Sequence, residues 1–149
     1  MVVWVRVRIR SKMSGRSVVT SAILNTGFGS IDVAEPMPPS VRVPTSVAEV
    51  LGFWPNIPAN ITREDYESGG GRISLLRVPN SVEVTVLTDD RAPRTVECSL
   101  VISPIANCVL LNDSAIESLG IIVVKPASGL WKFSDEEKLR RSAKPEFWG

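Results

Sequence analysis

One short segment of this chain carries most of its information: residues 22–30, with the sequence Ala-Ile-Leu-Asn-Thr-Gly-Phe-Gly-Ser. The apolar start predicts a buried strand, and Asn25 and Gly27 favour a turn directly after it. An ordinary strand end would have the same pattern. The segment therefore gains meaning only together with a second one near the other end of the chain.

That second segment is residues 109–121, with the sequence Val-Leu-Leu-Asn-Asp-Ser-Ala-Ile-Glu-Ser-Leu-Gly-Ile. Its first three residues predict a fully apolar strand, and most of the remainder predicts a short helix. Ser114 and Glu117 are spaced as in a capping box, and Gly120 is placed to end the helix. An apolar strand thus leads into a turn near both ends of the chain.

The composition limits the kinds of protein that this chain can be. Its 149 residues predict one domain with a core of its own, and its net charge of +1 gives no bulk attraction to nucleic acid or to acidic membranes. No apolar run approaches the ~18 residues of a membrane span, and the alternating, Arg-containing N-terminus is unlike a signal or transit peptide. We therefore expect a cytoplasmic protein. The absence of Gln hints at a thermophilic source.

Histidine and cysteine usage excludes several chemistries. The chain has no His, which removes Ser-His and Cys-His nucleophile systems and the commonest metal ligand. Its two cysteines, Cys98 and Cys108, are too few and too unpatterned for a disulfide framework or a zinc site. Both are expected to be buried thiols.

The N-terminus predicts a hairpin of two strands. Apolar residues at positions 3, 5, 7 and 9 alternate with Arg6, Arg8 and Arg10, which is the period of a half-buried strand. Ser14 and Gly15 form the turn, and residues 17–24 return as the second strand. The arginine row could bind nucleic acid or could simply be a solvated strand face that resists aggregation, and the second interpretation is favoured.

Most of the remaining chain also reads as strands and turns. Residues 34–44 carry four prolines and predict an extended or looped arm, and residues 46–52 predict a short helix capped by Ser46 and ended by Gly52. Three glycines, Gly69 to Gly71, predict a hairpin tip between the β-prone residues 61–66 and 73–78. Further strands are expected at residues 81–87, 95–103, 108–111, 121–124 and 129–133. Residues 134–149 are expected to be a charged helix or a mobile tail.

The two segments together resemble the motifs of retropepsin-like aspartic peptidases. There an apolar strand runs into Asp-Thr-Gly, and a Leu-Leu-Gly-x-Asp motif opens a helix near the C-terminus. Phe28 makes the first motif most similar to the prokaryotic single-domain branch. The resemblance covers residues 1–133 as the peptidase domain and leaves residues 134–149 as a charged C-terminal tail. It implies an all-β, retropepsin-like acid-protease half-barrel with one short C-terminal helix, functional as a symmetric homodimer.

Three positions depart from the family pattern. Asn112 replaces the usual Gly, and we expect it to tolerate the left-handed backbone that glycine would adopt. Ser114 replaces the Asp and should cap the helix about as well. Asn25 replaces the catalytic Asp, and this change decides activity, because the chemistry needs two carboxylates that share one proton.

The resemblance also implies the roles of the site residues. Asn25, at the position of the catalytic Asp, would face its symmetry mate, Thr26 would bond into the partner's loop, and Gly27 would let the substrate backbone approach. The substrate, an extended peptide or unfolded protein, would contact two groups of residues: Phe28, Gly29 and Ser30, and the flap glycines Gly69, Gly70 and Gly71. No metal or organic cofactor is implied, because the attacking group is water. The dimer contacts are expected from the N-terminal strand and residues 130–133, as open edges.

Two functions remain open from the sequence. The first is an aspartic endopeptidase inactivated by an Asp-to-Asn substitution at position 25. The alternative is a natural pseudo-peptidase that acts as a non-catalytic peptide-binding or dimerisation module. A third interpretation, a β-domain that binds nucleic acid through its arginine strand, is disfavoured, and no membrane partner is expected.

Overall fold

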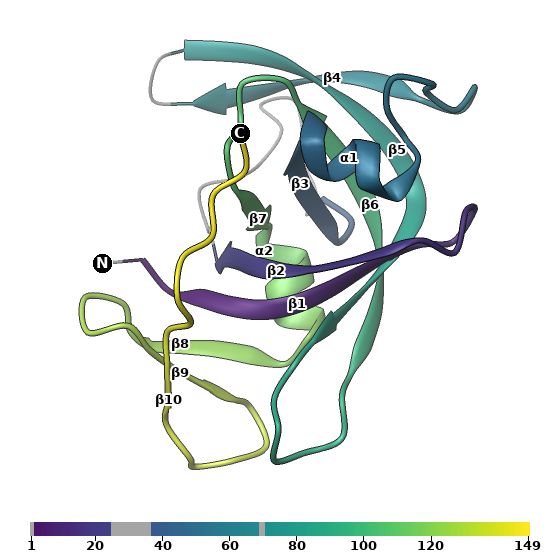
Figure 1. The fold of residues 1–149 in the computed structure, drawn as a ribbon. Coiled ribbons are helices and arrows are strands. Elements are labelled where there is room, and N and C mark those ends of the chain that lie inside the picture. Colours follow the sequence, from purple (N-terminus) through teal and green to yellow (C-terminus); the bar gives the residue numbers. More distant parts are fainter. Residues whose placement is uncertain (1, 25–36, 69–70) are drawn as a thin grey trace.

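A closed β-barrel forms the body of the molecule in the computed structural model, which describes residues 2–24, 37–68 and 71–149 (Figure 1). Six strands close the barrel in the order β1 (Trp4–Ser11), β2 (Ser17–Leu24), β7 (Val109–Leu111), β3 (Ser40–Pro44), β6 (Thr95–Ser103) and β5 (Gly71–Val86). Antiparallel pairing of β5 with β1, from Val7↔Val86 to Ser11↔Val82, completes the ring. The expected all-β architecture is confirmed, with two short helices added to it.

The alternation in β1 works as predicted. Val5, Val7 and Ile9 point into the barrel and are buried, whereas the three arginines between them are exposed. Two of these arginines carry partners: Arg6 Nη1 lies 2.5 Å from Glu146, and Arg10 Nη1 lies 3.0 Å from Glu83. The expected N-terminal hairpin is present, with β1 and β2 paired from Trp4↔Ile23 to Arg10↔Ser17.

Strand β5 serves two parts of the fold because a bulge bends it. Its pairing with β6 shifts register between Val78 and Val82, and Asn80 there has a φ of +47°. The residues before the bulge form a hairpin with β4 (Thr62–Ser68), which extends the sheet beyond the barrel. The residues after the bulge pair with β1 and close the ring. A bulge sharply bends one strand, which lets it belong to both parts.

The expected extended or looped arm is wrong for the residues of β3, which belong to the barrel sheet. Residues 40–44 form a strand between β7 and β6, inside the ring. Prolines are tolerated because Pro38 and Pro39 precede the strand and Pro44 ends it, so no hydrogen-bonding N–H is missing from its interior. The prolines on both sides of this strand made the sequence resemble a loop.

Two short helices pack against the core of the barrel. Helix α1 (Thr45–Leu51) buries Val47, Ala48 and Leu51, and ends at Gly52 in the predicted left-handed conformation, with φ +87°. The predicted cap at Ser46 is wrong, because the helix follows β3 directly and Pro44 occupies the N-cap position without a side-chain bond. Helix α2 (Asp113–Ser118) follows β7 and buries Ala115 and Ile116.

A small second sheet carries the end of the chain. It has the order β10 (Arg140–Arg141), β9 (Leu130–Phe133) and β8 (Ile121–Lys125), and it buries Trp131 and Phe133 against the barrel. Residues 134–149 are neither a helix nor loose, so that prediction is wrong. Figure 1 shows them in yellow, running past the start of β1 toward the connection between β6 and β7.

Hydrogen bonds and an aromatic anchor hold this tail. Ala143 N donates to Trp4 O at 2.8 Å, and Trp148 N donates to Asn107 O at 2.6 Å. The Trp148 indole Nε1 donates to Thr20 Oγ1 at 3.0 Å, and its ring packs against the main core. The mixed charge of the segment concealed this apolar anchor at its end. None of the helices in the described part of the chain has the length and apolar character needed to cross a membrane.

The edges available for a partner differ from those predicted. Strand β1 is paired with β2 on one side and β5 on the other, and β9 lies between β8 and β10. Neither is an open edge, so that part of the prediction is wrong. Within the described residues the longer outer strands are β4 and β8, and β8 exposes the side chains of Ile122 and Val124.

Candidate functional site at the ends of β2 and β7

The strands that lead into the two motifs lie side by side. Strands β2 and β7 are parallel neighbours, and Leu24 is the register partner of Leu111. Leu24 N also donates to Val3 O at 2.9 Å, which continues the pairing of the N-terminal hairpin to the last residue of β2. Because both strands end at the same level, Asn25 and Asn112 are the residues that directly follow a matched pair. The parallel pairing therefore brings together the two segments that the sequence singled out.

Most of the predicted site residues lie outside the described residues. This applies to Asn25, Thr26 and Gly27, to the substrate-binding positions 28–30, and to Gly69 and Gly70. Gly71 begins β5 and pairs with Ser68, which is the last pair of the β4–β5 hairpin before its tip. The predicted hairpin is confirmed up to that pair. In the view of Figure 1 the end of β4 and the carboxyl end of β2 both point to the left.

Asn112 has a role that the sequence analysis missed. Its side chain is buried, with 2 % of its surface exposed, and its Oδ1 accepts hydrogen bonds from Ser40 N at 2.9 Å and Ala115 N at 3.0 Å. Its Nδ2 donates to Pro38 O at 3.0 Å. One carboxamide thus caps α2 and holds the start of β3. Only a side chain with both an acceptor and a donor can do this.

These contacts correct two expectations. The cap of α2 is Asn112 and not Ser114, because the helix begins at Asp113 and Asn112 is the residue with extended backbone before it. Asn112 has φ −82° and ψ 174°, so it does not adopt the left-handed conformation that a substituted glycine would suggest. Residues 112–114, Asn-Asp-Ser, are all good capping residues. Because β7 ends at Leu111, the first of them, Asn112, becomes the N-cap.

Ser114 also contacts the segment before β3. Its Oγ donates to Met37 O, and Ser40 Oγ donates to Pro38 O at 2.9 Å. Met37 is the first described residue after positions 25–36. The unit formed by β7 and α2 therefore holds both ends of the segment that carries Asn-Thr-Gly: Leu24 through strand pairing, and residues 37–40 through Asn112 and Ser114. We call this arrangement the β7–α2 clamp.

The two thiols do not supply a nucleophile. Cys98 and Cys108 are free and buried, as predicted. Burial raises the pKa of Cys98 to about 12 and also raises the pKa of Cys108, an effect that the nearby Arg42 partly opposes. A thiol with a raised pKa is a poor nucleophile and a poor metal ligand. Over the described part of the chain, no cluster of three or more His, Cys, Asp or Glu could hold a metal ion.

Comparison with known proteins adds no family assignment. No protein-family model matches the chain, and no curated protein matches it. The protein is therefore described by its fold and its site alone. It is a closed six-stranded barrel in which β2 leads into the Asn-Thr-Gly segment and its parallel neighbour β7 leads into the β7–α2 clamp.

Proposed function

We propose that this chain is a retropepsin-like aspartic endopeptidase that works as a symmetric homodimer and that is inactive because Asn25 stands at the position of the catalytic Asp. One observation supports it best. The parallel register of Leu24 with Leu111, together with the bonds from Asn112 and Ser114 to residues 37–40, holds the ends of the Asn-Thr-Gly segment against a single rigid unit. Catalytic groups need that kind of support to keep their geometry.

The mechanism of peptide hydrolysis explains why the side-chain group at position 25 decides activity. With Asp at position 25, each protomer would contribute one carboxylate to a pair that shares one proton. The ionised carboxylate would remove a proton from water as it attacks the peptide carbonyl, and the protonated one would donate to the carbonyl oxygen. A carboxamide has no titratable proton in this range. Asn25 therefore removes both roles and leaves the surrounding surface available for binding.

Peptide binding would use the two ends of the proposed groove. Gly27 would allow the peptide backbone to approach, and positions 28–30 would contact its side chains. The β4–β5 hairpin would close over the peptide as the flap, pairing with it as an added strand. Phe28 and Ile31 favour apolar substrate side chains. Asn112 and Ser114 are positioning residues in this scheme, since they act on the segment and not on the substrate.

A natural pseudo-peptidase is the second candidate, and Asn25 itself favours it. Such a protein would keep the dimer and the peptide groove without hydrolysis. The native gene separates the two candidates, because an Asp codon at position 25 identifies an engineered chain. The proposed fold and dimer are common to both.

Restoring the acid tests the proposal. The Asn25→Asp protein should degrade a denatured protein substrate at acid pH, whereas Asn25→Gln should not, because it lacks a carboxylate. A folded Asn25→Asp dimer that leaves unstructured substrates intact between about pH 3 and 7 would overturn the proposal.

A further inference from the structure

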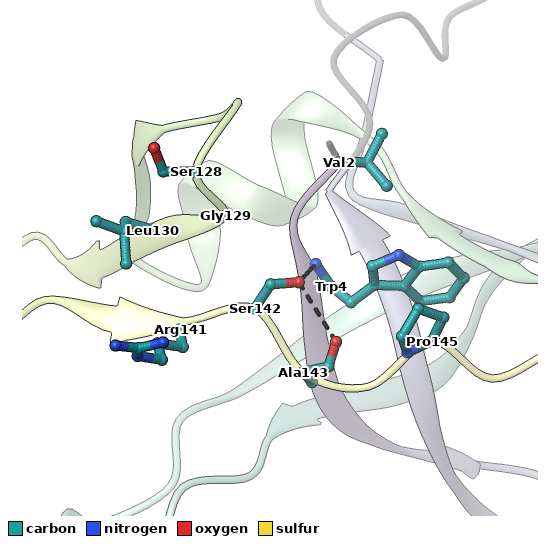
Figure 2. Close-up of a pocket in the computed structure, with 9 residues that line it drawn as sticks. All are labelled: Val2, Trp4, Ser128, Gly129, Leu130, Arg141, Ser142, Ala143 and Pro145. Carbon is teal, nitrogen blue, oxygen red and sulfur yellow. Dashed lines mark hydrogen bonds between the residues drawn. The ribbon is translucent and has the colours of Figure 1, made fainter.

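A cavity of about 260 Å³ lies between the start of β1, the turn that joins β8 to β9, and the C-terminal tail (Figure 2). None of these elements carries a motif of the proposed peptidase site. Figure 2 shows Val2 and Trp4 on one side of the cavity and Leu130 and Arg141 across from them. Pro145 of the tail lies beside the Trp4 ring.

The walls of this cavity are fixed to one another. Trp4 N donates to Ser142 Oγ at 2.8 Å, Ala143 N donates to Trp4 O at 2.8 Å, and Ser142 N donates to Gly129 O at 2.7 Å. These bonds join all three elements around the cavity. It is therefore preformed, as most small-molecule sites are.

Trp4 supplies a hydrogen-bond donor without an acceptor. The residue as a whole is 5 % exposed, and no described residue accepts a hydrogen bond from its Nε1, but this atom is not among the buried polar atoms that lack a partner and is therefore open to solvent. The indole groups of two other tryptophans differ: Trp131 Nε1 donates to Arg141 O at 3.3 Å, and Trp148 Nε1 donates to Thr20 Oγ1 at 3.0 Å. The Trp4 Nε1–H is therefore available to water or to a molecule bound in the cavity.

Arg141 adds a cation at the opposite wall. The neighbouring Arg140 is engaged by Asp90 and Glu136, but no described carboxylate lies within ion-pair distance of the Arg141 guanidinium. Among the described residues that line the cavity, none is acidic. The described lining therefore combines apolar side chains with two kinds of donor, one of them the cationic Arg141.

We propose that this cavity binds an apolar group that carries a carboxylate. The aromatic or branched part would contact Val2, Trp4 and Leu130, and the carboxylate would accept hydrogen bonds from the Arg141 guanidinium, whose planar fork matches a carboxylate in a bidentate manner. Two sources share this chemistry: a small arylalkyl or branched acid, and the C-terminus of a peptide that ends in an apolar residue. The inference does not depend on the proposed peptidase activity.

Indole NMR signals of the ¹⁵N-labelled protein provide the test, with phenylacetate as the probe. The Trp4 Nε1–H signal, assigned by its loss in Trp4→Phe, should shift with a Kd of about 1 mM or tighter, while the Trp131 and Trp148 signals stay in place. Phenylacetamide, which has the same shape and no charge, should bind at least about tenfold more weakly.

Two variants and two peptides complete the experiment. Arg141→Gln should weaken phenylacetate binding at least about tenfold, whereas the matched control Arg8→Gln, on the exposed face of β1, should not change it. A short peptide ending in Phe with a free carboxylate will shift the Trp4 signal if peptide termini are the source, and will leave it unchanged if only small acids fit; the amidated peptide should bind in neither case. A folded protein whose Trp4 signal ignores phenylacetate at about 10 mM, or an unchanged affinity in Arg141→Gln, would overturn the proposal.

Discussion

Asn112 and Ser40 are joined by two hydrogen bonds that connect helix α2 to strand β3. Asn112 Oδ1 accepts from Ser40 N at 2.9 Å, and Asn112 N donates to Ser40 O at 3.2 Å. The two residues lie far apart in the sequence, and residues 25–36 separate Leu24 from the strand that Ser40 begins. The pair therefore fixes where the Asn-Thr-Gly segment returns to the barrel.

Removing the Asn112 side chain should destabilise the protein. In Asn112→Ala, Ser40 N, Ala115 N and Pro38 O all lose a buried partner. With ~1 kcal/mol for a lost cap and ~1–3 kcal/mol for an unpaired buried group, we expect a loss of about 2–4 kcal/mol in the free energy of unfolding, measured with urea.

Asn112→Asp is the matched control for that experiment. It keeps the acceptor for both N–H groups, loses the donor to Pro38 and introduces a carboxylate whose buried charge is partly offset by the N-terminus of α2, so it should lie between wild type and Asn112→Ala. If Asn112→Ala costs less than about 0.5 kcal/mol, as exposed substitutions do, the clamp contributes nothing to stability.

An ion-pair network should make the tail sensitive to strong acid. Arg140 donates to Glu136 Oε1 at 2.7 Å and to Asp90 Oδ1 at 2.9 Å. The hydrogen bond from Arg140 lowers the pKa of Glu136 from its ordinary 4.5 to about 2, and the pKa of Asp90 is also held well below its usual range. Because the folded-state pKa values are lowered, the stabilisation is complete above the ordinary pKa and disappears as pH falls through the folded one.

The variant Arg140→Gln measures this effect. The difference in stability between wild type and Arg140→Gln should be largest above about pH 5 and should shrink between about pH 4.5 and 2. A small constant part should remain, since the Arg140 guanidinium also lies over the Phe133 ring, 5.2 Å from its centroid. A difference that stays the same from pH 6 to pH 2 would show that these carboxylates do not hold the tail.

The chain should be a homodimer in solution. A symmetric two-acid site needs a second copy, and the described outer strand β8 carries the exposed apolar side chains of Ile122 and Val124. Sedimentation at tens of micromolar should give twice the chain mass. A monomer at that concentration would rule out the symmetric site and leave only a non-catalytic role.

Substitution at the hairpin tip should damage turnover more than folding. Gly70 lies between Ser68 and Gly71, the last pair of the β4–β5 hairpin. In the Asn25→Asp background, Gly70→Val should lower turnover strongly, because a β-branched residue restricts the backbone freedom that closure needs. Stability should change by only about 1 kcal/mol.

Thr62→Val, at the other end of the same hairpin, is the control for Gly70→Val. It keeps strand propensity and lies at the first pair, Thr62↔Arg77, away from the tip. It should leave turnover unchanged. Equal turnover in both variants would mean that the glycines form a passive loop.

The sequence predicted correctly those elements whose structure depends on residues close together in the chain. The alternation of valine and arginine in β1 depends only on which face meets the core, so the sequence was sufficient there. The glycine ending α1 was also predictable, because Gly52 adopts a left-handed conformation that few other residues accept.

Long-range pairing decided the elements that were missed. The prolines around β3 suggested an arm, yet residues 40–44 pair with strands from the other end of the chain. The cap of α2 depended on where β7 ends, and the tail depended on Trp148 reaching Thr20. No periodicity within a segment reports a contact of that kind.

The pH dependence of peptide cleavage by Asn25→Asp tests the central claim most directly. A quenched fluorescent peptide with apolar residues around the cleavage point serves as substrate, and Asn25→Gln serves as the folded control without an acid. The account predicts a bell-shaped rate within about pH 3–7, set by two apparent pKa values that belong to the carboxylate pair, and complete inhibition by a statine-type transition-state mimic. A folded, dimeric Asn25→Asp protein with no cleavage above that of Asn25→Gln across this range would contradict it.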